Sequence, residues 1–423
     1  MESPRTIHAD RDRDKPIYAV WELTMRCDHA CAHCGSRAGN PRTSELELDE
    51  MKEVANALAR LGCREVTLIG GEAYLYPFIF PIMRHLKSLG LRVTMQTGGR
   101  GINPRMAHKL RSAGLSALGV SIDGPEDVHD TLRSKLGSFY YALQALKNAQ
   151  AEGLPTSVNT QVNRLNYHRL RETLGLLQPT GIRAWRIQLT VPMGRAADRP
   201  DWILEPYQII EVMDTLAEMQ LEIAQENHDA GRKPQRMLDI QLGNNVGYYG
   251  PHEIILRSRP GKQAAYWQGC QAGRYTIGIE SNGTVKGCPS LPTAPYVGGN
   301  VRDLSLEDIW RTAPELQFVR TRTTDELWGF CKTCDYADIC RAGCSFTTHC
   351  TLGRRGNNPF CYHRAATLRR DGRRERLQRV DLAPGTPYDF GRFEIVEEDW
   401  PADEAAGGPA ESSASASMVS ATP

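Results

Sequence analysis

Residues 23–39, LTMRCDHACAHCGSRAG, place three cysteines directly after a predicted strand, with the spacing Cys27-x3-Cys31-x2-Cys34. Three thiolates in so short a loop can surround one iron–sulfur cluster and leave its fourth iron without a protein ligand, which is the iron that a small chelating cofactor needs. A structural zinc site is the alternative, because His29 or His33 can complete a set of three cysteines and one histidine. The position after the first strand of an α/β barrel favours a catalytic site.

Strand and helix patterns alternate along the chain from residue 17. Short apolar runs alternate with amphipathic stretches, and each pair occupies about 30 residues, the length of a β–α unit. The predicted strands are 17–24, 65–70, 91–97, 115–123, 155–162 and 184–191, and the predicted helices are 47–61, 78–89, 104–113, 138–152, 166–177 and 205–227. This alternation predicts a parallel α/β sheet, either an open, partial (β/α)6 barrel of the TIM type or a doubly wound sheet.

Composition narrows the class of protein. Hydrophobic residues make up 40% and charged residues 24% of the 423 positions, which is ordinary for a globular protein, and the length favours two folded units. The formal net charge of +1 gives no general attraction to nucleic acid or to an anionic membrane. No apolar run is long enough to cross a bilayer, and the charged N-terminus is not a secretory signal. We therefore expect the protein in the cytoplasm, without nucleic-acid or membrane partners.

The expected cytoplasmic location decides how the twelve cysteines are interpreted. In a reducing compartment, clustered thiols are more often metal ligands or catalytic groups than disulfides. Eleven fall in two groups, at 27–34 and at 270–361, and Cys63 is interpreted as a small buried hydrophobic residue. The second group lies in a segment rich in Cys, Gly and Thr, which is typical of a small domain held together by bound metal.

The sequence predicts six parts. A polar lead-in (1–16) precedes the barrel (17–230), an irregular bridge (231–267), the cysteine-rich domain (268–366), a basic C-terminal segment (367–400) and a disordered tail (401–423). Residues 365–381 are predicted to form an arginine-rich helix, whose arginines either form a solvated face or bind an acidic partner. The basic residues concerned are His363, Arg364, Arg369, Arg370, Arg373, Arg374 and Arg376.

The first cysteine motif resembles the signature of the radical S-adenosylmethionine (SAM) superfamily. The resemblance implies a [4Fe–4S] cluster whose open iron binds SAM, and a 5′-deoxyadenosyl radical formed by reductive cleavage. Gly70-Gly71-Glu72 at the end of the second strand resembles the GGE motif that receives the SAM amino group. The glycines permit a close backbone approach to the ligand, and the carboxylate of Glu72 suits an ammonium group.

Further motifs match this family in the same order. Ser121-Ile122-Asp123-Gly124 resembles the SxDG segment near the SAM ribose or carboxylate, and 129–139 resembles the HDxxR…GSF stretch, in which Arg133 suits the SAM carboxylate. Val191-Pro192-Met193-Gly194-Arg195-Ala196 resembles the loop near adenine. The cofactor contacts that the resemblance implies are Gly70, Gly71, Glu72, Ser121, Asp123, Arg133, Gln188, Val191 and Arg195.

The second cysteine group resembles the SPASM domain, an extension that binds two auxiliary [4Fe–4S] clusters. The pattern is Cys270-x12-Gly283-x4-Cys288, then Cys331-x2-Cys334-x5-Cys340-x3-Cys344, then Cys361. The resemblance implies that one cluster takes Cys270, Cys288 and Cys344, and the other takes Cys331, Cys334, Cys340 and Cys361. A zinc ribbon is the alternative for Cys331-x2-Cys334 alone. The first auxiliary cluster has no eighth cysteine upstream, and Cys350 is either its spare ligand or a free thiol.

The resemblance implies an enzyme that abstracts a substrate hydrogen and passes an electron to auxiliary clusters. The leading hypothesis is a maturase that crosslinks or otherwise oxidises a ribosomally synthesised peptide, with a separate leader-binding protein and a flavodoxin or ferredoxin as electron donor. The alternatives are a dehydrogenase or decarboxylase of a small molecule, such as a sugar alcohol or a porphyrin, and a non-enzymatic metal-binding scaffold.

The candidate catalytic residues lie at or near the carboxyl ends of predicted strands, where barrel active sites form. Each of them also has a structural interpretation, and His129 suits a hydrogen-bonded loop residue. The candidates are Asp123, His129, Tyr140 and Gln188, with Asp127 as a further acid in the same region.

Overall fold

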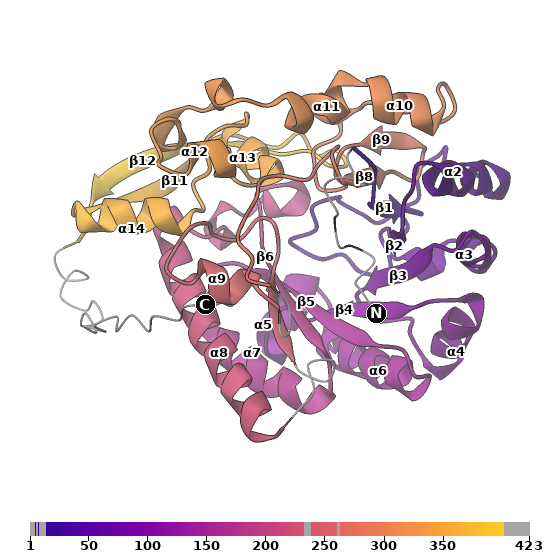
Figure 1. The fold of residues 1–423 in the computed structure, drawn as a ribbon. Helices are drawn as coiled ribbons and strands as arrows, with labels where there is room; N and C mark the ends of the chain where they lie inside the picture. Colours follow the sequence, from indigo (N-terminus) through magenta and orange to yellow (C-terminus); the bar gives the residue numbers. More distant parts are fainter. Residues whose placement is uncertain (1–4, 6, 8–13, 232–237, 260–262, 402–423) are drawn as a thin grey trace, which may run out of the picture.

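The computed structural model describes residues 5, 7, 14–231, 238–259 and 263–401 (Figure 1). One sheet of ten strands runs through the molecule in the order β10-β9-β8-β1-β2-β3-β4-β5-β6-β7. Strands β1 to β7 are parallel, and each pairs with the next along the chain. The first six are β1 Tyr18–Glu22, β2 Glu65–Ile69, β3 Arg92–Thr97, β4 Ala117–Ser121, β5 Thr156–Val162 and β6 Ala184–Leu189.

Helices cover the outer face of these six strands. They are α2 Leu48–Arg60, α3 Ile79–Ser88, α4 Pro104–Ala113, α5 Glu126–Arg133, α6 Ser138–Ala151, α7 Leu170–Leu177 and α8 Ile209–Asp229. Outward strand residues such as Trp21 and Leu68 share one apolar core with Met51 of α2 and Ile82 of α3. The predicted partial (β/α)6 barrel of the TIM type is confirmed, and the doubly wound alternative is excluded because the face opposite the helices is the polar interior of the barrel.

The region expected to be an irregular bridge contains a seventh parallel strand. Strand β7, Asp239–Leu242, pairs with β6, and the short helix α9, Glu253–Arg257, follows it. A strand of four residues has too little periodic pattern to be recognised in a sequence rich in Gly and Tyr. The barrel wall is therefore longer by one strand than predicted.

The cysteine-rich part is built onto the same sheet. Strand β8, Thr276–Ile279, pairs in parallel with β1, and β9, Thr284–Lys286, and β10, Gly299–Asn300, continue the sheet in antiparallel fashion. The helices of this part are α10 Leu306–Thr312, α11 Pro314–Thr321, α12 Ala337–Cys340 and α13 Ser345–Leu352, which lie above the barrel in Figure 1. This continuity fixes the second cysteine group relative to the first.

The predicted helix at 365–381 is wrong beyond residue 370. Helix α14, Tyr362–Arg370, is followed by an antiparallel pair, β11 Arg373–Asp381 and β12 Arg392–Asp399. Arg373 and Arg374 pair across the strands with Glu397 and Glu398, both at 2.7 Å, and buried Arg364 forms a bidentate ion pair with Glu375. Opposite charges on facing strands stabilise a sheet. The arginines named here are neutralised within the hairpin rather than forming a solvated helix face.

Several predictions concern residues outside the described part. The tail predicted to be disordered (401–423) lies outside the described residues except for Pro401, and only Arg5, Ile7 and residues 14–16 of the lead-in are described. Arg5 donates to the Glu65 carboxylate through Nε at 2.8 Å and lies 3.7 Å from the centre of the Tyr18 ring. Cys63 is buried in the core, as predicted. Among the described helices, none combines the length and apolarity that a membrane span requires.

Candidate active site

Cys27, Cys31 and Cys34 lie in the loop that follows β1, and none of them is in a disulfide. Burial raises the pKa of Cys27 well above its usual value, and the nearby Cys31 and Cys34 thiolates raise it further. Burial also raises the pKa of Cys31 to about 11, against the opposing effect of the Arg133 guanidinium. One buried and two half-buried thiols that repel one another when ionised fit a bound cationic group, because bound iron removes that penalty.

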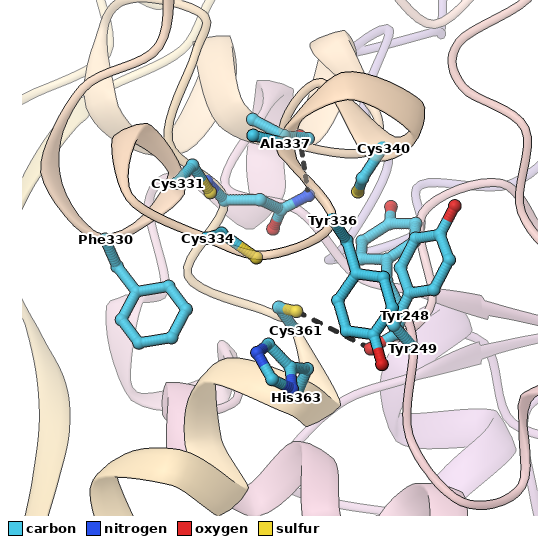
Figure 2. Close-up of a pocket in the computed structure, with 12 residues that line it drawn as sticks. Tyr248, Tyr249, Phe330, Cys331, Cys334, Tyr336, Ala337, Cys340, Cys361 and His363 are labelled. Atoms are coloured by element: carbon cyan, nitrogen blue, oxygen red, sulfur yellow. Dashed lines mark hydrogen bonds between the residues drawn. The ribbon is translucent and has the colours of Figure 1, made fainter.

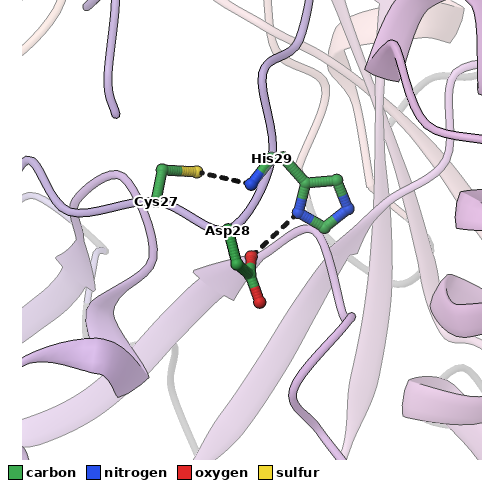
Figure 3. Close-up of side chains that lie close together, drawn as sticks. All are labelled: Cys27, Asp28 and His29. Atoms are coloured by element: carbon green, nitrogen blue, oxygen red, sulfur yellow. Dashed lines mark hydrogen bonds and ion pairs between the residues drawn. The ribbon is translucent and has the colours of Figure 1, made fainter. Parts of the chain in front are cut away.

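The two histidines beside these thiols are engaged elsewhere. His33 contacts the Leu132 carbonyl oxygen through Nδ1 at 3.0 Å, and its Nε2 lies 3.5 Å from Asp123. The donor atoms of Cys27, Asp28 and His29 lie within 4.8 Å of one another, but His29 Nδ1 is bonded to Asp28 at 3.0 Å (Figure 3). Both imidazoles are thus engaged through Nδ1, but the buried Nε2 of His29 has no hydrogen-bond partner in the described part of the chain, so the zinc alternative keeps one candidate fourth ligand.

Two arginines hold the thiol loop by its carbonyl groups. Arg195 donates to Cys31 O at 2.7 Å and to Ala38 O at 3.1 Å, and Arg199 donates to Ala32 O at 3.1 Å. The 191–196 segment that contains Arg195 is predicted to lie near adenine, and the structure shows that the Arg195 guanidinium braces the thiol loop. Arg199 is a residue that sequence reasoning missed, although it stands four positions after Arg195.

Gly70 and Gly71 are predicted to let the backbone approach SAM, and the structure shows a second steric requirement for glycine at both positions. A Cβ atom at Gly70 would lie 2.5 Å from Thr24 O, and one at Gly71 would lie 2.3 Å from Arg26 O and 2.7 Å from Cys27 Cβ. The glycines therefore let the end of β2 pack against the thiol loop itself, so that Glu72 is held beside it. Gly71 and Glu72 also donate backbone N–H groups to Thr24 O and Arg26 O, both at 2.8 Å.

Glu72 is buried at the carboxyl end of β2. Its carboxylate accepts hydrogen bonds from the Thr97 hydroxyl and the Gly98 N–H, both at 2.6 Å. Burial raises the pKa of Glu72 to about 7, although both hydrogen bonds act in the opposite direction. A buried carboxylate without a cation is the environment into which an ammonium group would fit, as the resemblance to the GGE motif implies.

Asp123 and Arg133 are bound to each other. Arg133 donates to Asp123 Oδ2 through Nε and Nη2, both at 2.7 Å, while Gln161 N–H donates to Asp123 Oδ1 at 3.0 Å. Arg133 Nη1 also lies 3.8 Å from Cys31 Sγ and donates to it. Asp123 is fully buried, so the ion pair is what permits its charge there. The pair connects β4 to the thiol loop, and Asp123 has no oxygen left as a free base.

Three other candidates have distinct positions. His129 is buried, accepts the Asp123 N–H at Nδ1, and burial lowers its pKa to about 3. Tyr140 is 60% exposed on α6, where its ring meets Tyr141, so it does not join the site. Ser121 and Gln188 lie on the inner strand face, and Gln188 accepts from Gln161 Nε2 at 3.3 Å. Gln188 lies on the inner face of β6, and its catalytic role stays a prediction.

Val191 lies in an apolar cluster that connects the two cysteine-rich parts. The cluster contains Met25, Ala38, Val191, Met193, Cys350 and Tyr388, with Cys27 and Cys34 packed against it. Tyr388 comes from the loop between β11 and β12, and its hydroxyl donates to Glu22 at the end of β1. The same loop is joined to 193–194 by the Met193–Phe390 bridge and by Gly194 N–H donating to Asp389 O at 2.8 Å. The C-terminal loop is thus part of the site wall, which sequence reasoning missed.

The structure brings Cys270, Cys288 and Cys344 together. Burial raises the pKa of Cys344 to about 12, and the Cys270 and Cys288 thiolates raise it further. Cys270 and Cys288 pack against one apolar cluster with Phe346. Cys350 is completely buried on α13, and after burial the Cys344 thiolate is what raises its pKa most. Cys350 therefore lies between this group and the first thiol loop.

Cys331, Cys334, Cys340 and Cys361 line one pocket, and Figure 2 shows their sulfur atoms around its centre. Aromatic side chains close the pocket, with the Tyr249 and Tyr336 rings stacked 4.3 Å apart. Burial raises the pKa of Cys361 to about 12, and the Cys331 and Cys334 thiolates add to this effect. Four thiols around one enclosed space fit a cluster or a metal ion better than they fit four separate free cysteines.

Comparisons with known proteins agree with this geometry. Residues 21–177 match the Radical SAM superfamily, and residues 270–335 match SPASM, an iron–sulfur cluster-binding domain. An AdoMet-dependent heme synthase from Methanosarcina barkeri is 29% identical over 82% of this chain and 97% of its own. The mycofactocin maturase MftC from Mycobacterium ulcerans is 28% identical over 85% of this chain and 91% of its own.

Solved structures share the fold. Streptococcus suis SuiB bound to S-adenosylmethionine has a TM-score of 0.59 at 17% identity, over 79% of this chain and 74% of its own. Native anSMEcpe with bound AdoMet has a TM-score of 0.64 at 16% identity, over 83% of this chain and 95% of its own. The chain belongs to the radical SAM superfamily. It is a radical SAM enzyme whose partial barrel is followed by a SPASM domain, and these domains imply [4Fe–4S] clusters and SAM binding.

Proposed function

We propose that this enzyme oxidatively modifies a ribosomally synthesised peptide and that two auxiliary clusters accept the electron released. The observation that carries this proposal is the gathering of the SPASM thiols into two groups, one of three and one of four, on a domain that continues the barrel sheet. A hydrogen abstraction that ends in a closed-shell product must release one electron and one proton. Rigidly placed auxiliary clusters suit that electron transfer.

The residues divide the work as follows. Cys27, Cys31 and Cys34 would hold the catalytic cluster, and Glu72 would receive the SAM ammonium. Asp123 would hold the Arg133 guanidinium in place, so that its positive charge stays beside Cys31. When bound, the reduced cluster and SAM supply a 5′-deoxyadenosyl radical that abstracts a substrate hydrogen. Gln188 and the polar inner face of the barrel would position the substrate.

The two SPASM thiol groups are the proposed ligands of the auxiliary clusters. Cys270, Cys288 and Cys344 would hold one cluster, and Cys331, Cys334, Cys340 and Cys361 the other. A flavodoxin or ferredoxin would supply the first electron in the cytoplasm. A separate protein would bind the peptide leader, since the C-terminal arginines named above are paired with glutamates.

A peptide substrate is supported by two of the comparisons. MftC is named a mycofactocin maturase, and SuiB has been solved bound to precursor peptide SuiA. A small-molecule substrate is the second candidate, because relatives of similar identity are named AdoMet-dependent heme synthase and Fe-coproporphyrin III synthase.

Anaerobic reconstitution followed by mass spectrometry separates these candidates. The enzyme is loaded with iron and sulfide, reduced with dithionite, and given SAM with either a short peptide encoded beside its gene or Fe-coproporphyrin III. A peptide product about two mass units lighter, formed together with 5′-deoxyadenosine, supports the proposal. Loss of carbon dioxide from the porphyrin with an unchanged peptide would replace it with the second candidate, and the absence of 5′-deoxyadenosine would contradict both.

A further inference from the structure

Arg186 lies on the inner face of the barrel wall. Along β6, Trp185, Ile187 and Leu189 alternate with Arg186 and Gln188, and the first three belong to the core beneath the helices. Because successive side chains of a strand point to opposite faces, Arg186 and Gln188 face the barrel interior. The charges that act on Arg186 include Arg5 and Glu65, and Glu65 lies on β2 at the opposite side of the sheet order.

Amides stand opposite Arg186 on both neighbouring strands, and the Asp239 carboxylate of β7 stands opposite Ala184, two residues away. In the sheet register, Arg186 stands opposite Asn159 of β5 and Gln241 of β7. The Asn159 amide donates to Gln96 on β3, and Gln241 donates to Asp239 at 3.0 Å. These amide side chains can donate hydrogen bonds beside the guanidinium, and they cannot neutralise its charge.

No acidic group of the described chain pairs with Arg186. It makes no hydrogen bond or ion pair with any residue that the structure describes, although it is only partly accessible. Glu65 is already shared by Arg5 and by Arg92, whose Nη1 lies 2.6 Å from Glu65 Oε2. Burial, followed by the repulsion from Arg5, lowers the pKa of Arg186 to about 10. The lower interior of the barrel therefore has an excess of positive charge.

A half-buried guanidinium without a partner is partly desolvated and gains stability when a ligand supplies an opposite charge. We propose that Arg186 binds a carboxylate of the substrate inside the barrel, with Asn159 and Gln241 beside it as hydrogen-bond donors. The planar fork of arginine matches a carboxylate in a bidentate manner. This inference rests on the proposed function, since it takes the peptide as substrate and assigns the carboxylate to an acidic side chain or to the peptide C-terminus.

The test uses the full-length reconstituted enzyme as wild type, Arg186→Gln and Arg186→Lys. Arg183→Gln is the matched control, because Arg183 precedes the same strand and is exposed. The peptide is offered with all its carboxylates and in forms in which one carboxylate at a time is an amide. The readouts are KM and kcat for product, together with 5′-deoxyadenosine formed without peptide.

Arg186→Gln should raise KM about 30-fold or more, because removing one partner of a hydrogen-bonded charge pair leaves the other charge unpaired. Formation of 5′-deoxyadenosine without peptide should stay unchanged, which shows that the fold and the SAM site are intact. One of the peptides in which a carboxylate is replaced by an amide should raise the KM of wild type by a similar factor and leave the KM of Arg186→Gln unchanged. The carboxylate replaced in that peptide is the one that Arg186 binds. Arg186→Lys should recover part of the loss, and Arg183→Gln should behave as wild type.

An unchanged KM in Arg186→Gln, or amide effects equal in both proteins, would overturn the inference while leaving the proposed function standing. If wild type converts no peptide, the proposed function fails on its own, and a second arm tests the carboxylate site. Coproporphyrin III and its tetramethyl ester are then titrated by absorbance into wild type and Arg186→Gln. Weaker binding of the acid alone to the variant supports the carboxylate site, and equal binding to both proteins refutes it.

Discussion

The thiol loop after β1 and the four-thiol pocket of the SPASM domain are surrounded by different chemistry. Guanidinium groups approach the first, with Arg133 at Cys31 Sγ and Arg195 and Arg199 on the loop carbonyls. Aromatic rings enclose the second, where Tyr336 and His363 meet at 5.0 Å. The first group (Cys27, Cys31 and Cys34) has three thiols, and we call it the open group because a cluster held there keeps one iron free. Arginine side chains brace its loop through the backbone carbonyl groups. The second group (Cys331, Cys334, Cys340 and Cys361) has a fourth thiol that completes its pocket, and we call it the closed group.

The largest effect should come from the open group. Cys31→Ala should abolish formation of 5′-deoxyadenosine, because two thiols cannot hold a cluster with one free iron. Chromatography of reaction mixtures and iron analysis of the reconstituted protein measure the loss. Cys63→Ala is the control, since this thiol lies in the apolar core and its hydrogen bonds go to the backbone carbonyl oxygens of Ile17 and Glu65. Retained SAM cleavage in Cys31→Ala would contradict the assignment of the site.

The closed group should behave differently. Cys331→Ala together with Cys361→Ala should abolish peptide product and leave the formation of 5′-deoxyadenosine without peptide intact, because the first loop keeps all of its ligands. Iron content should fall by about four atoms per chain, the content of one [4Fe–4S] cluster. Normal product formation in this double variant would show that the pocket is structural and has no function in electron transfer.

The barrel and both thiol groups could be predicted from the sequence because their signals are local. A strand such as 156–162 alternates in burial, and C-x2-C spacing places thiols near each other whatever the surrounding fold. The pairing of β8 with β1 and of β11 with β12 could not be predicted, because those partners are brought together only by the folded chain. The arginines at 373–376 suggested a helix, and their glutamate partners lie about twenty residues further on.

The same limit applies to the roles of single residues in the site. Asp123 and Arg133 are each predicted to lie near SAM, and the structure adds that these two buried charged groups pair with each other. Arg195 was expected near a ligand, and it holds backbone carbonyls of the thiol loop. A motif places a residue near the site, but its partner depends on distances that only the folded structure provides.

A variant of Arg133 tests whether the positive charge beside the open group stabilises the fold and the reduced cluster. Arg133→Gln leaves the buried Asp123 carboxylate without its cation and should reduce the free energy of unfolding by about 3–5 kcal/mol. It should also make the first cluster harder to reduce, since a positive donor at Cys31 Sγ stabilises the more negative state. Thermal unfolding and a redox titration followed by electron paramagnetic resonance measure the two effects. Arg171→Gln, on the exposed surface of α7, is the control.

A variant that also lacks Asp123 separates the two causes. In Asp123→Asn with Arg133→Gln no buried charge is left unpaired, so most of the lost stability should return while the cluster potential stays lowered. A potential that returns together with stability would mean that the loop had merely been displaced, and that the contact between Arg133 and Cys31 does not tune the cluster.

Glu72 should give the smallest effect, and it depends on pH. Its pKa is raised to about 7 in the folded protein, above the ordinary 4.5, so the folded state holds this proton more tightly than the unfolded state. Stability should therefore fall as pH rises from about 4.5 to about 7, by on the order of 3 kcal/mol without SAM. Glu72→Gln should remove this part of the pH dependence. Unfolding midpoints of both proteins between pH 5 and 8 measure it, and parallel curves would show that Glu72 is already paired with a cation before SAM binds.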